Sequence, residues 1–185
     1  LHPLNSKPKV PTMRLTLSIA IGSLLAVPAA ATNAAELNLN IEIPRINAAE
    51  YHRPYVAVWV EGADQKAVAD LAVWYQQRDG KEGHGTKWLP DLRQWWRKSG
   101  RSLKVPVDGI TAPTRPVGKH VLKLDEKHSA LAKLPAGKYT LVVEAAREVG
   151  GRELLKIPFE WKGKPSTGSA QGKTELGTLT LSAKS

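Results

Sequence analysis

The strongest constraint on the fold of this chain is a repeated alternation of apolar and polar residues. In ELNLNIEI (36–43), the apolar side chains of Leu37, Leu39, Ile41 and Ile43 alternate with polar neighbours. A period of two residues is typical of a strand with one buried face. Further short apolar stretches lie at 54–62, 68–76, 117–125, 137–148, 153–161 and 175–182. The sequence therefore predicts a protein built mainly from strands.

The connections between these stretches indicate how the strands pair. GADQKA (62–67) separates two apolar stretches and predicts a β-hairpin, while LPAG and VGGRE bracket the stretch at 137–148. About seven short strands joined by turns rich in Gly and Pro are typical of a two-sheet sandwich. We therefore expect residues 36–185 to form a single all-β domain, an immunoglobulin-like β-sandwich with one short helix in a loop.

The N-terminal part differs in composition from the rest of the chain. A positively charged start precedes an apolar run and a tail of small residues, AAATNAA. This order predicts a secretory signal peptide over 13–35, cleaved after Ala31, Ala34 or Ala35. Residues 1–12 are then an upstream extension of the reading frame. The alternative is an N-terminal helix that anchors the protein.

Composition limits the chemistry of the exported part. The chain has no cysteine, which excludes disulfides, thiolate metal sites and a cysteine nucleophile. Three of the 27 Lys and Arg precede residue 36, so 24 remain against 17 Asp and Glu, a net charge of +7. A basic surface suits anionic lipid headgroups or phosphorylated small molecules, or it only keeps the protein dispersed. For an exported protein we expect no nucleic-acid partner, and no stretch after the leader is apolar enough to predict a transmembrane helix.

WLPDLRQWWRKSG (88–100) breaks the alternation. Apolar residues recur every three or four positions between Leu89 and Trp96, which predicts a helix over about 90–98 that caps one open end of the sandwich. Its tryptophans either pack in the core or offer a surface on which a planar ring stacks. Lys98 is expected to face outward. The side chains predicted to form a docking surface are Arg93, Trp95, Trp96 and Arg97.

Other candidate sites are weaker. The histidines after the leader are His52, His84, His120 and His128. They lack the close spacing of metal ligands and are interpreted as surface or strand-edge residues, although His84 lies on a glycine-rich loop where a metal is conceivable. Residues 163–175 hold almost no apolar residue and predict a mobile hairpin tip or linker. No nucleophile elbow is present, and we assign no catalytic or metal-binding residue.

Four blocks of the sequence carry a resemblance to a known family. They are RPYVAVWVEGADQKAVADLAVWY, LPDLRQWWRKSG, VDGITAPTRPVGKHVLKLD and LPAGKYTLVVEAAREVGGREL, in that order. Between about Ile43 and Leu181 the chain resembles the predicted periplasmic proteins catalogued as domain of unknown function 2271. The resemblance implies an exported bacterial domain whose relatives are encoded beside PepSY-type membrane proteins and FAD:protein FMN transferases, which are associated with electron transfer outside the cytosol.

This context implies a function for the loop VPVDGITAPTRPVG (105–118). Targets of the transferase are similar to the pattern Asp-x-x-Ser/Thr-Gly/Ser/Ala-Ala-Thr/Ser, whose last hydroxyl attacks FAD and keeps FMN through a phosphoester bond. The positions that agree with the pattern are Asp108, Thr111, Ala112 and Thr114. Pro113 stands where the pattern has alanine.

The prolines of this loop bear on how its hydroxyls are presented. Pro113 and Pro116 each favour an extended backbone in the residue before them, so we expect Thr114 on a stiff, exposed arch. Arg115 would then offer charge-assisted hydrogen bonds to an attached phosphate. The alternative is a crossover from helix to strand in which the loop only turns the chain.

Two hypotheses follow. The first is a periplasmic, redox-associated carrier with FMN attached covalently at Thr114, modified by an FAD:protein FMN transferase and working with a PepSY-type membrane protein. The second is a cofactor-free periplasmic module that uses the predicted helix to dock a membrane protein. An autonomous enzyme is the third alternative.

Overall fold

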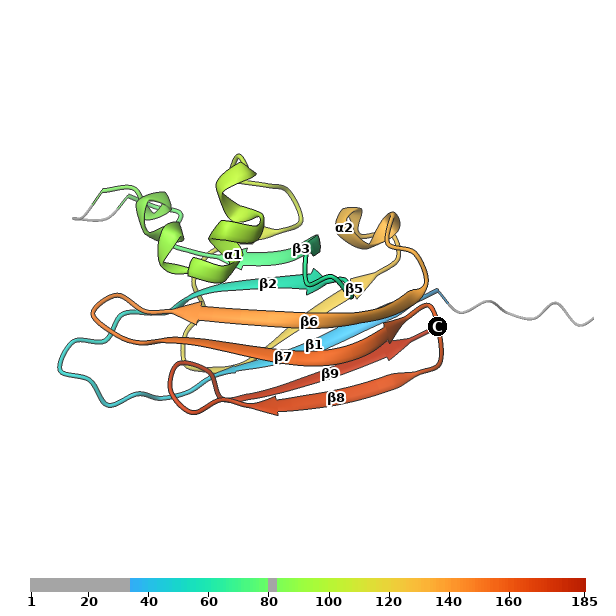
Figure 1. Cartoon of the computed structure of the whole chain (residues 1–185). Helices are drawn as coiled ribbons and strands as arrows, with labels where there is room; N and C mark the ends of the chain where they lie inside the picture. Colours follow the sequence, from blue (N-terminus) through green and yellow to red (C-terminus); the bar gives the residue numbers. More distant parts are fainter. Residues whose placement is uncertain (1–33, 80–82) are drawn as a thin grey trace, which may run out of the picture. The chain divides into compact units, whose positions relative to one another are not determined.

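The computed structural model describes residues 34–79 and 83–185. The described residues form two β-sheets packed face to face, which confirms the predicted all-β sandwich (Figure 1). The finer expectation of an immunoglobulin-like strand arrangement stays a prediction. The upstream extension at 1–12 and nearly all of the predicted signal peptide lie outside the described residues.

The first sheet has four antiparallel strands in the order β5-β1-β9-β8. Their bounds are β5 Gly118–Asp125, β1 Glu36–Ile43, β9 Thr178–Lys184 and β8 Ser166–Gln171. The apolar residues of β1 are buried and its polar residues are not, as the alternation predicts. Ala35, placed at the end of the predicted signal peptide, is buried in this core, and its carbonyl accepts a hydrogen bond from the amide of Glu126. The folded core therefore begins before β1.

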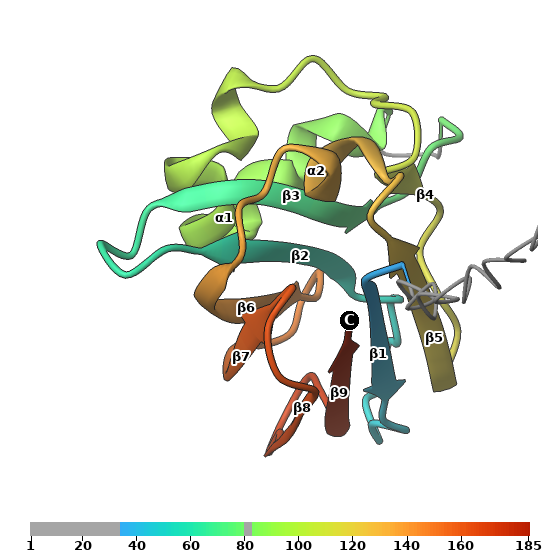
Figure 2. The same ribbon diagram turned by 90° about the vertical axis from the view of Figure 1, so that its right-hand side faces the viewer.

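The second sheet has five strands in the order β4-β3-β2-β6-β7. Their bounds are β4 Thr111–Ala112, β3 Ala67–Trp74, β2 Tyr55–Glu61, β6 Gly137–Ala146 and β7 Arg152–Trp161. All pairs are antiparallel except that of β3 with β4, and β2 and β3 form the hairpin predicted at GADQKA. At one side of the sandwich β7 leads into β8, and Figure 2 shows these two strands side by side.

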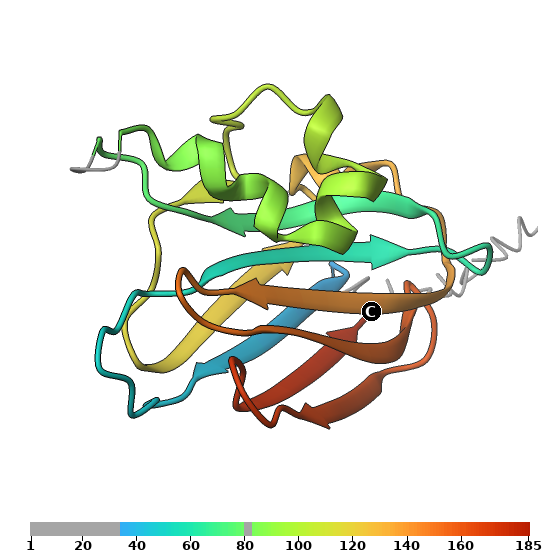
Figure 3. The same ribbon diagram turned by 60° about the vertical axis from the view of Figure 1, so that its left-hand side comes forward.

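A helical layer, residues 85–103, covers the outer face of the five-stranded sheet (Figure 3). It consists of η1 (Gly85–Asp91), α1 (Arg93–Lys98) and η2 (Gly100–Ser102). The outer faces of β2, β3 and β6 carry Ala57, Trp59, Val73 and Val142, which are fully buried against this layer. These apolar side chains need a cover, because leaving them in water would cost the free energy that their burial gains.

The helix predicted over 90–98 therefore needs two corrections. The chain forms a 3-10 helix that contains Pro90 and then a separate α-helix, with Leu92 between them in a non-helical conformation. The layer lies on a face of the sheet and not at an open end of the sandwich, because both faces of the central strands are apolar.

The segment 163–175 also differs from the prediction. Instead of a free hairpin tip it contains β8, which pairs with β9 along its whole length. A short helix not predicted from the sequence, α2 (Ser129–Ala132), follows β5 and buries Leu131 in the main core. No helix of the described residues is long and apolar enough to cross a membrane.

Candidate functional site

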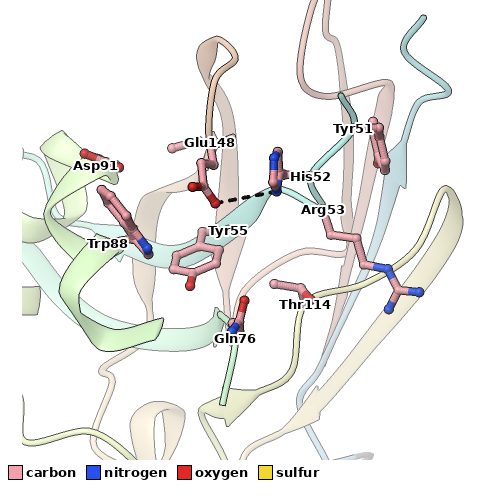
Figure 4. Close-up of a pocket in the computed structure, with 10 residues that line it drawn as sticks. Tyr51, His52, Arg53, Tyr55, Gln76, Trp88, Asp91, Thr114 and Glu148 are labelled. Carbon is pink, nitrogen blue, oxygen red and sulfur yellow. Dashed lines mark ion pairs between the residues drawn. The ribbon is translucent and has the colours of Figure 1, made fainter. Parts of the chain in front are cut away.

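A cavity of about 220 Å³ lies where several strand ends of the five-stranded sheet meet (Figure 4). Because β2 runs antiparallel to β3 and β6, the start of β2 lies beside the ends of the other two strands. The strand β4 is parallel to β3 and ends at the same edge. Tyr55, Gln76, Glu148 and Thr114 come to line the cavity in this way, although they are far apart in the sequence.

Aromatic side chains form part of the cavity wall. Tyr51 and Tyr55 come from the loop before β2 and from its first residue, and Trp88 comes from η1. Figure 4 shows the ring of Tyr55 between Trp88 and Thr114. The Tyr55 hydroxyl donates a hydrogen bond of 3.1 Å to the carbonyl of Gly85, which fastens η1 to the sheet. Burial raises the pKa of the Tyr55 hydroxyl, so this group stays protonated at neutral pH.

Charged side chains lie on the other walls of the cavity. His52 lies 3.1 Å from a carboxylate oxygen of Glu50 and 3.5 Å from one of Glu148. Arg53 and Asp91 also line the cavity, and within the described part of the chain no ion pair involves either of them. The cavity thus combines aromatic faces with both signs of charge, which suits a planar, polar ligand.

Thr114 is half-buried and lines this cavity. Among the described residues, its hydroxyl takes part in no hydrogen bond. The predicted exposed arch is therefore wrong in one respect: the side chain lies in the wall of a cavity. It is not packed between the two sheets, because it is absent from the core clusters of the domain.

The other residues of the predicted attachment pattern lie outside the cavity. Asp108 is exposed and makes no ion pair with any described residue. Thr111 is part of β4, and its hydroxyl accepts a hydrogen bond of 2.8 Å from the amide of Val107. The amides of Val73 and Tyr75 donate to the carbonyls of Ile110 and Ala112 at 2.9 and 3.1 Å. The middle of the predicted pattern is therefore tied to the sheet.

Arg115 follows Thr114 and is half-buried against an aromatic ring. Its guanidinium carbon lies 5.2 Å from the centre of the Trp74 ring, within the range of a cation–π contact. The same ring meets His120 edge-on, with 6.0 Å between the ring centres. The Nε atom of Arg115 is buried without a hydrogen-bond partner among the described residues. This side chain thus keeps an unused donor one residue along the chain from Thr114, but it does not line the cavity.

The predicted docking surface is only partly exposed. Arg93 and Arg97 are exposed and Trp96 is half-buried, but Trp95 is fully buried. Trp95 packs under α1, where its indole Nε1 donates a 2.8 Å hydrogen bond to Asp70. The prediction that Trp95 belongs to an outward surface is therefore wrong, because its ring is buried against the apolar outer face of the sheet.

His120 lies on β5, an edge strand, and His52, His84 and His128 lie outside the strands. His120 hydrogen-bonds the carbonyl of Pro116 at 2.8 Å, and His128 that of Gly109 at 3.1 Å. His84 lies beside Asp79. The described residues contain no group of three or more His, Asp or Glu side chains arranged to hold a metal ion.

Two buried carboxylates, Glu144 and Glu61, and the half-buried Asp70 hold the helical layer to the sheet, and the sequence analysis missed all three. Glu144 accepts hydrogen bonds from the amides of Gln94 and Trp95, and Asp70 from Trp95 and Ser99. Glu61 binds Trp59, Lys98 and Lys156. A single acid inside an apolar strand, as in TLVVEAA or VADLAVW, is the signal that points to such anchors, since buried charges need partners.

Over residues 36–178 the chain matches the model of a family described as a predicted periplasmic protein (DUF2271). The match covers all strands from β1 to β8 and the cavity residues named above. No curated protein and no solved structure matches the chain.

Proposed function

Since the chain belongs to the DUF2271 family of predicted periplasmic proteins, we propose that it is an exported accessory protein that carries FMN, attached covalently through the hydroxyl of Thr114. A flavin held there would supply redox chemistry between a membrane partner, of the PepSY type, and an acceptor outside the cytosol. An FAD:protein FMN transferase attaches it.

The observation that supports this proposal best is the position of Thr114. The sequence pattern selects this residue without reference to any cavity, and its side chain lies in the wall of the aromatic cavity, with no hydrogen bond to another described residue. By contrast, the hydroxyl of Thr111 is engaged by the Val107 amide. A free hydroxyl beside an aromatic pocket is what an attachment site for a planar cofactor needs.

The residues around Thr114 bear on how a flavin and its phosphate would be held. Arg115, the next residue, does not line the cavity, and its buried, unpartnered Nε would have to turn away from the Trp74 ring to donate to an anion there. Tyr51, Tyr55 and Trp88 offer ring faces for stacking. The cavity of about 220 Å³ is smaller than the ~300 Å³ at which ligand pockets usually begin. The flavin ring would therefore stay partly exposed, as a carrier that must exchange electrons with other proteins requires.

The attachment step is a group transfer in which this chain supplies the nucleophile. The oxygen of the Thr114 hydroxyl forms a bond to the FMN phosphorus of FAD, the bond between the two phosphates breaks, and AMP leaves. The hydroxyl proton passes to a base of the transferase. A flavin, once bound, supplies one- and two-electron redox chemistry. This chain contributes the attachment point and the aromatic wall.

Coexpression with an FMN transferase tests the proposal. We expect the parent chain to be yellow and to gain the mass of one FMN less one water. Thr114→Ala should remove both the colour and the added mass. Pro113→Ala, which restores the alanine of the pattern, should raise the modified fraction. A parent chain without added mass, or a Thr114→Ala variant that keeps it, would refute the proposal.

The structure weakens the alternative of a cofactor-free module that docks a membrane protein through its helix. That surface was expected to consist of Arg93, Trp95, Trp96 and Arg97, and its central ring, Trp95, is buried. Protein interfaces usually depend on such large aromatic anchors near their centre. The exposed part that remains is mainly cationic.

A further inference from the structure

The positive charge of this protein is concentrated in one short segment. Residues 36–185 carry 24 Lys and Arg against 17 Asp and Glu, a net charge of +7. Within 85–104, which includes the helical layer, there are six cations, Lys87, Arg93, Arg97, Lys98, Arg101 and Lys104, against the single acid Asp91. Five of the seven excess charges thus lie in 20 residues, and the rest of the domain is nearly balanced.

Most of these cations are exposed and unpaired. Arg93, Arg97, Arg101 and Lys104, which we call the basic strip, are exposed, and no ion pair joins any of them to another described residue. Lys98 instead binds the buried Glu61. The acids under the layer do not neutralise the strip, because Glu61 is also paired with Lys156 and Glu144 with Arg152. Of these three acids, only Asp70 has no cation partner among the described residues.

The helix geometry orients part of the strip away from the sheet. Arg93, Trp96 and Arg97 stand at positions i, i+3 and i+4 of α1, which share one face of a helix. Trp95 lies on the opposite face and is buried against the sheet. The outward face of α1 therefore carries two arginines and the half-buried ring of Trp96. A hollow beside Arg93 is also lined by Trp88, Asp91 and Glu148.

We propose that the basic strip docks the protein onto an anionic phospholipid surface, with Trp96 at the headgroup level. An exposed, unpaired set of cations next to one amphipathic ring matches phosphate headgroups, which need charge and hydrogen-bond donors but no shaped pocket. The inference does not depend on the flavin. It would place the cavity, whose wall includes Trp88 of the same layer, near the membrane.

Vesicle sedimentation tests this proposal with the chain as purified from expressing cells. We expect binding to phosphatidylcholine vesicles that contain phosphatidylglycerol, little binding to phosphatidylcholine alone, and weaker binding as salt rises. Each basic residue near an anionic surface contributes about a fivefold gain in affinity, so the triple variant Arg93→Gln, Arg97→Gln, Arg101→Gln should bind about a hundredfold more weakly.

The matched control removes the same charge from the far sheet. Lys119, Lys123 and Lys184 are exposed on β5 and β9, and replacing all three by Gln should lower affinity only a few-fold. Unchanged urea unfolding of both triple variants shows that they fold. Thr114→Ala should bind vesicles like the parent, which separates this test from that of the flavin. Brominated lipids should quench fluorescence in the parent and less in Trp96→Phe.

Three results would overturn the proposal. One is an absence of binding to the anionic vesicles at low salt. Another is an equal loss in the two triple variants, which would reflect net charge and not the strip. The third is that the chain binds polyglutamate through the basic strip but does not bind the anionic vesicles. This result would assign the strip to an acidic protein partner.

Discussion

The carboxylate of Glu144, on β6, accepts a 2.8 Å hydrogen bond from the backbone amide of Trp95, in the first turn of α1. The same carboxylate accepts from the amide of Gln94 and pairs with Arg152 at 2.8 Å. The first amides of a helix lack partners within it, and a carboxylate is their best acceptor. One buried side chain of the sheet thus fixes where the helix of the covering layer begins.

Replacing this anchor should destabilise the domain. Glu144→Gln removes the charge from the contact with Arg152, whose side chain is 39% exposed, and replaces one acceptor of the α1 amides by a donor. We expect a loss of about 2 kcal/mol in the free energy of unfolding, because a buried amide of α1 is left without its acceptor. Urea denaturation followed by fluorescence measures it. Glu126→Gln, whose carboxylate is 41% exposed and 4.0 Å from Lys162, is the control and should change stability by less than about 0.5 kcal/mol.

Acid should loosen the contact between the layer and the sheet through Glu61. Burial tends to raise the pKa of Glu61, but hydrogen bonds from Lys98, Lys156 and Trp59 outweigh it, so the pKa in the folded protein lies below the usual 4.5. A carboxyl whose pKa is lowered on folding stabilises the fold above its unfolded pKa, and this contribution is lost as the pH falls below about 4.5. The free energy of unfolding, measured at a series of pH values, should fall less between neutral and acid pH in Glu61→Gln than in the parent. An identical pH profile would contradict this role.

The contribution of Asp70 to stability should change with pH in the direction opposite to that of Glu61. Burial raises its pKa above the usual 3.8, despite hydrogen bonds from Ser99 and Trp95. A raised carboxyl pKa means that its contribution is most favourable at low pH and falls as the pH rises from 3.8 through the folded pKa. The stability of Asp70→Asn relative to the parent should therefore increase with pH across that interval. A difference that does not change with pH would show that ionisation of Asp70 has no part in stability.

The neighbouring residues Trp95 and Trp96 should contribute very differently to the free energy of unfolding. Trp95→Ala leaves a cavity under α1 and removes one of the two hydrogen bonds that Asp70 accepts from the layer, and we expect it to cost about 4 kcal/mol of unfolding free energy. Trp96 is half-buried, and Trp96→Ala should cost about 1 kcal/mol. Comparable losses in urea denaturation of the two variants would contradict the described packing of α1.

Flavin transfer should require local opening of β4. The segment that contains Thr111 and Ala112 is bonded to β3 through the amides of Val73 and Tyr75, and a transferase cannot grip it in that state. Short edge strands open locally at a small part of the global cost. We therefore expect the purified chain to take up FMN faster in urea at concentrations well below its unfolding transition. An unstructured peptide substrate, measured in the same urea concentrations, serves as the control for the activity of the transferase. A rate that falls with urea would argue that the folded loop is itself the substrate.

Much of the fold could be predicted, because alternation marks strands that are half-buried. It predicted β1 well, since its inward residues are apolar and its outward ones polar. It failed for β8, whose residues are almost all small and polar. That strand is held by its pairing with β9 and by Gly168, where a Cβ would lie 2.5 Å from Ile157. Neither constraint is visible in the local sequence.

The candidate site could be predicted only in part for a related reason. The pattern around Thr114 is local and was visible in the sequence. Its aromatic neighbours Tyr55 and Trp88 reach it only because β2 and the covering layer both begin where β3 and β6 end. The sequence showed the aromatic residues of the helical segment but not which ring the sheet would bury, so Trp95 was assigned to the wrong surface.

The most direct test of the flavin proposal is a tryptic peptide map of the chain coexpressed with the transferase. Cleavage after Lys104 and Lys119 releases a peptide whose hydroxyl-bearing residues are Thr111 and Thr114. We predict that this peptide carries FMN and that fragmentation places it on Thr114. FMN on Thr111, on another peptide or on none would contradict the assignment of Thr114 as the attachment point.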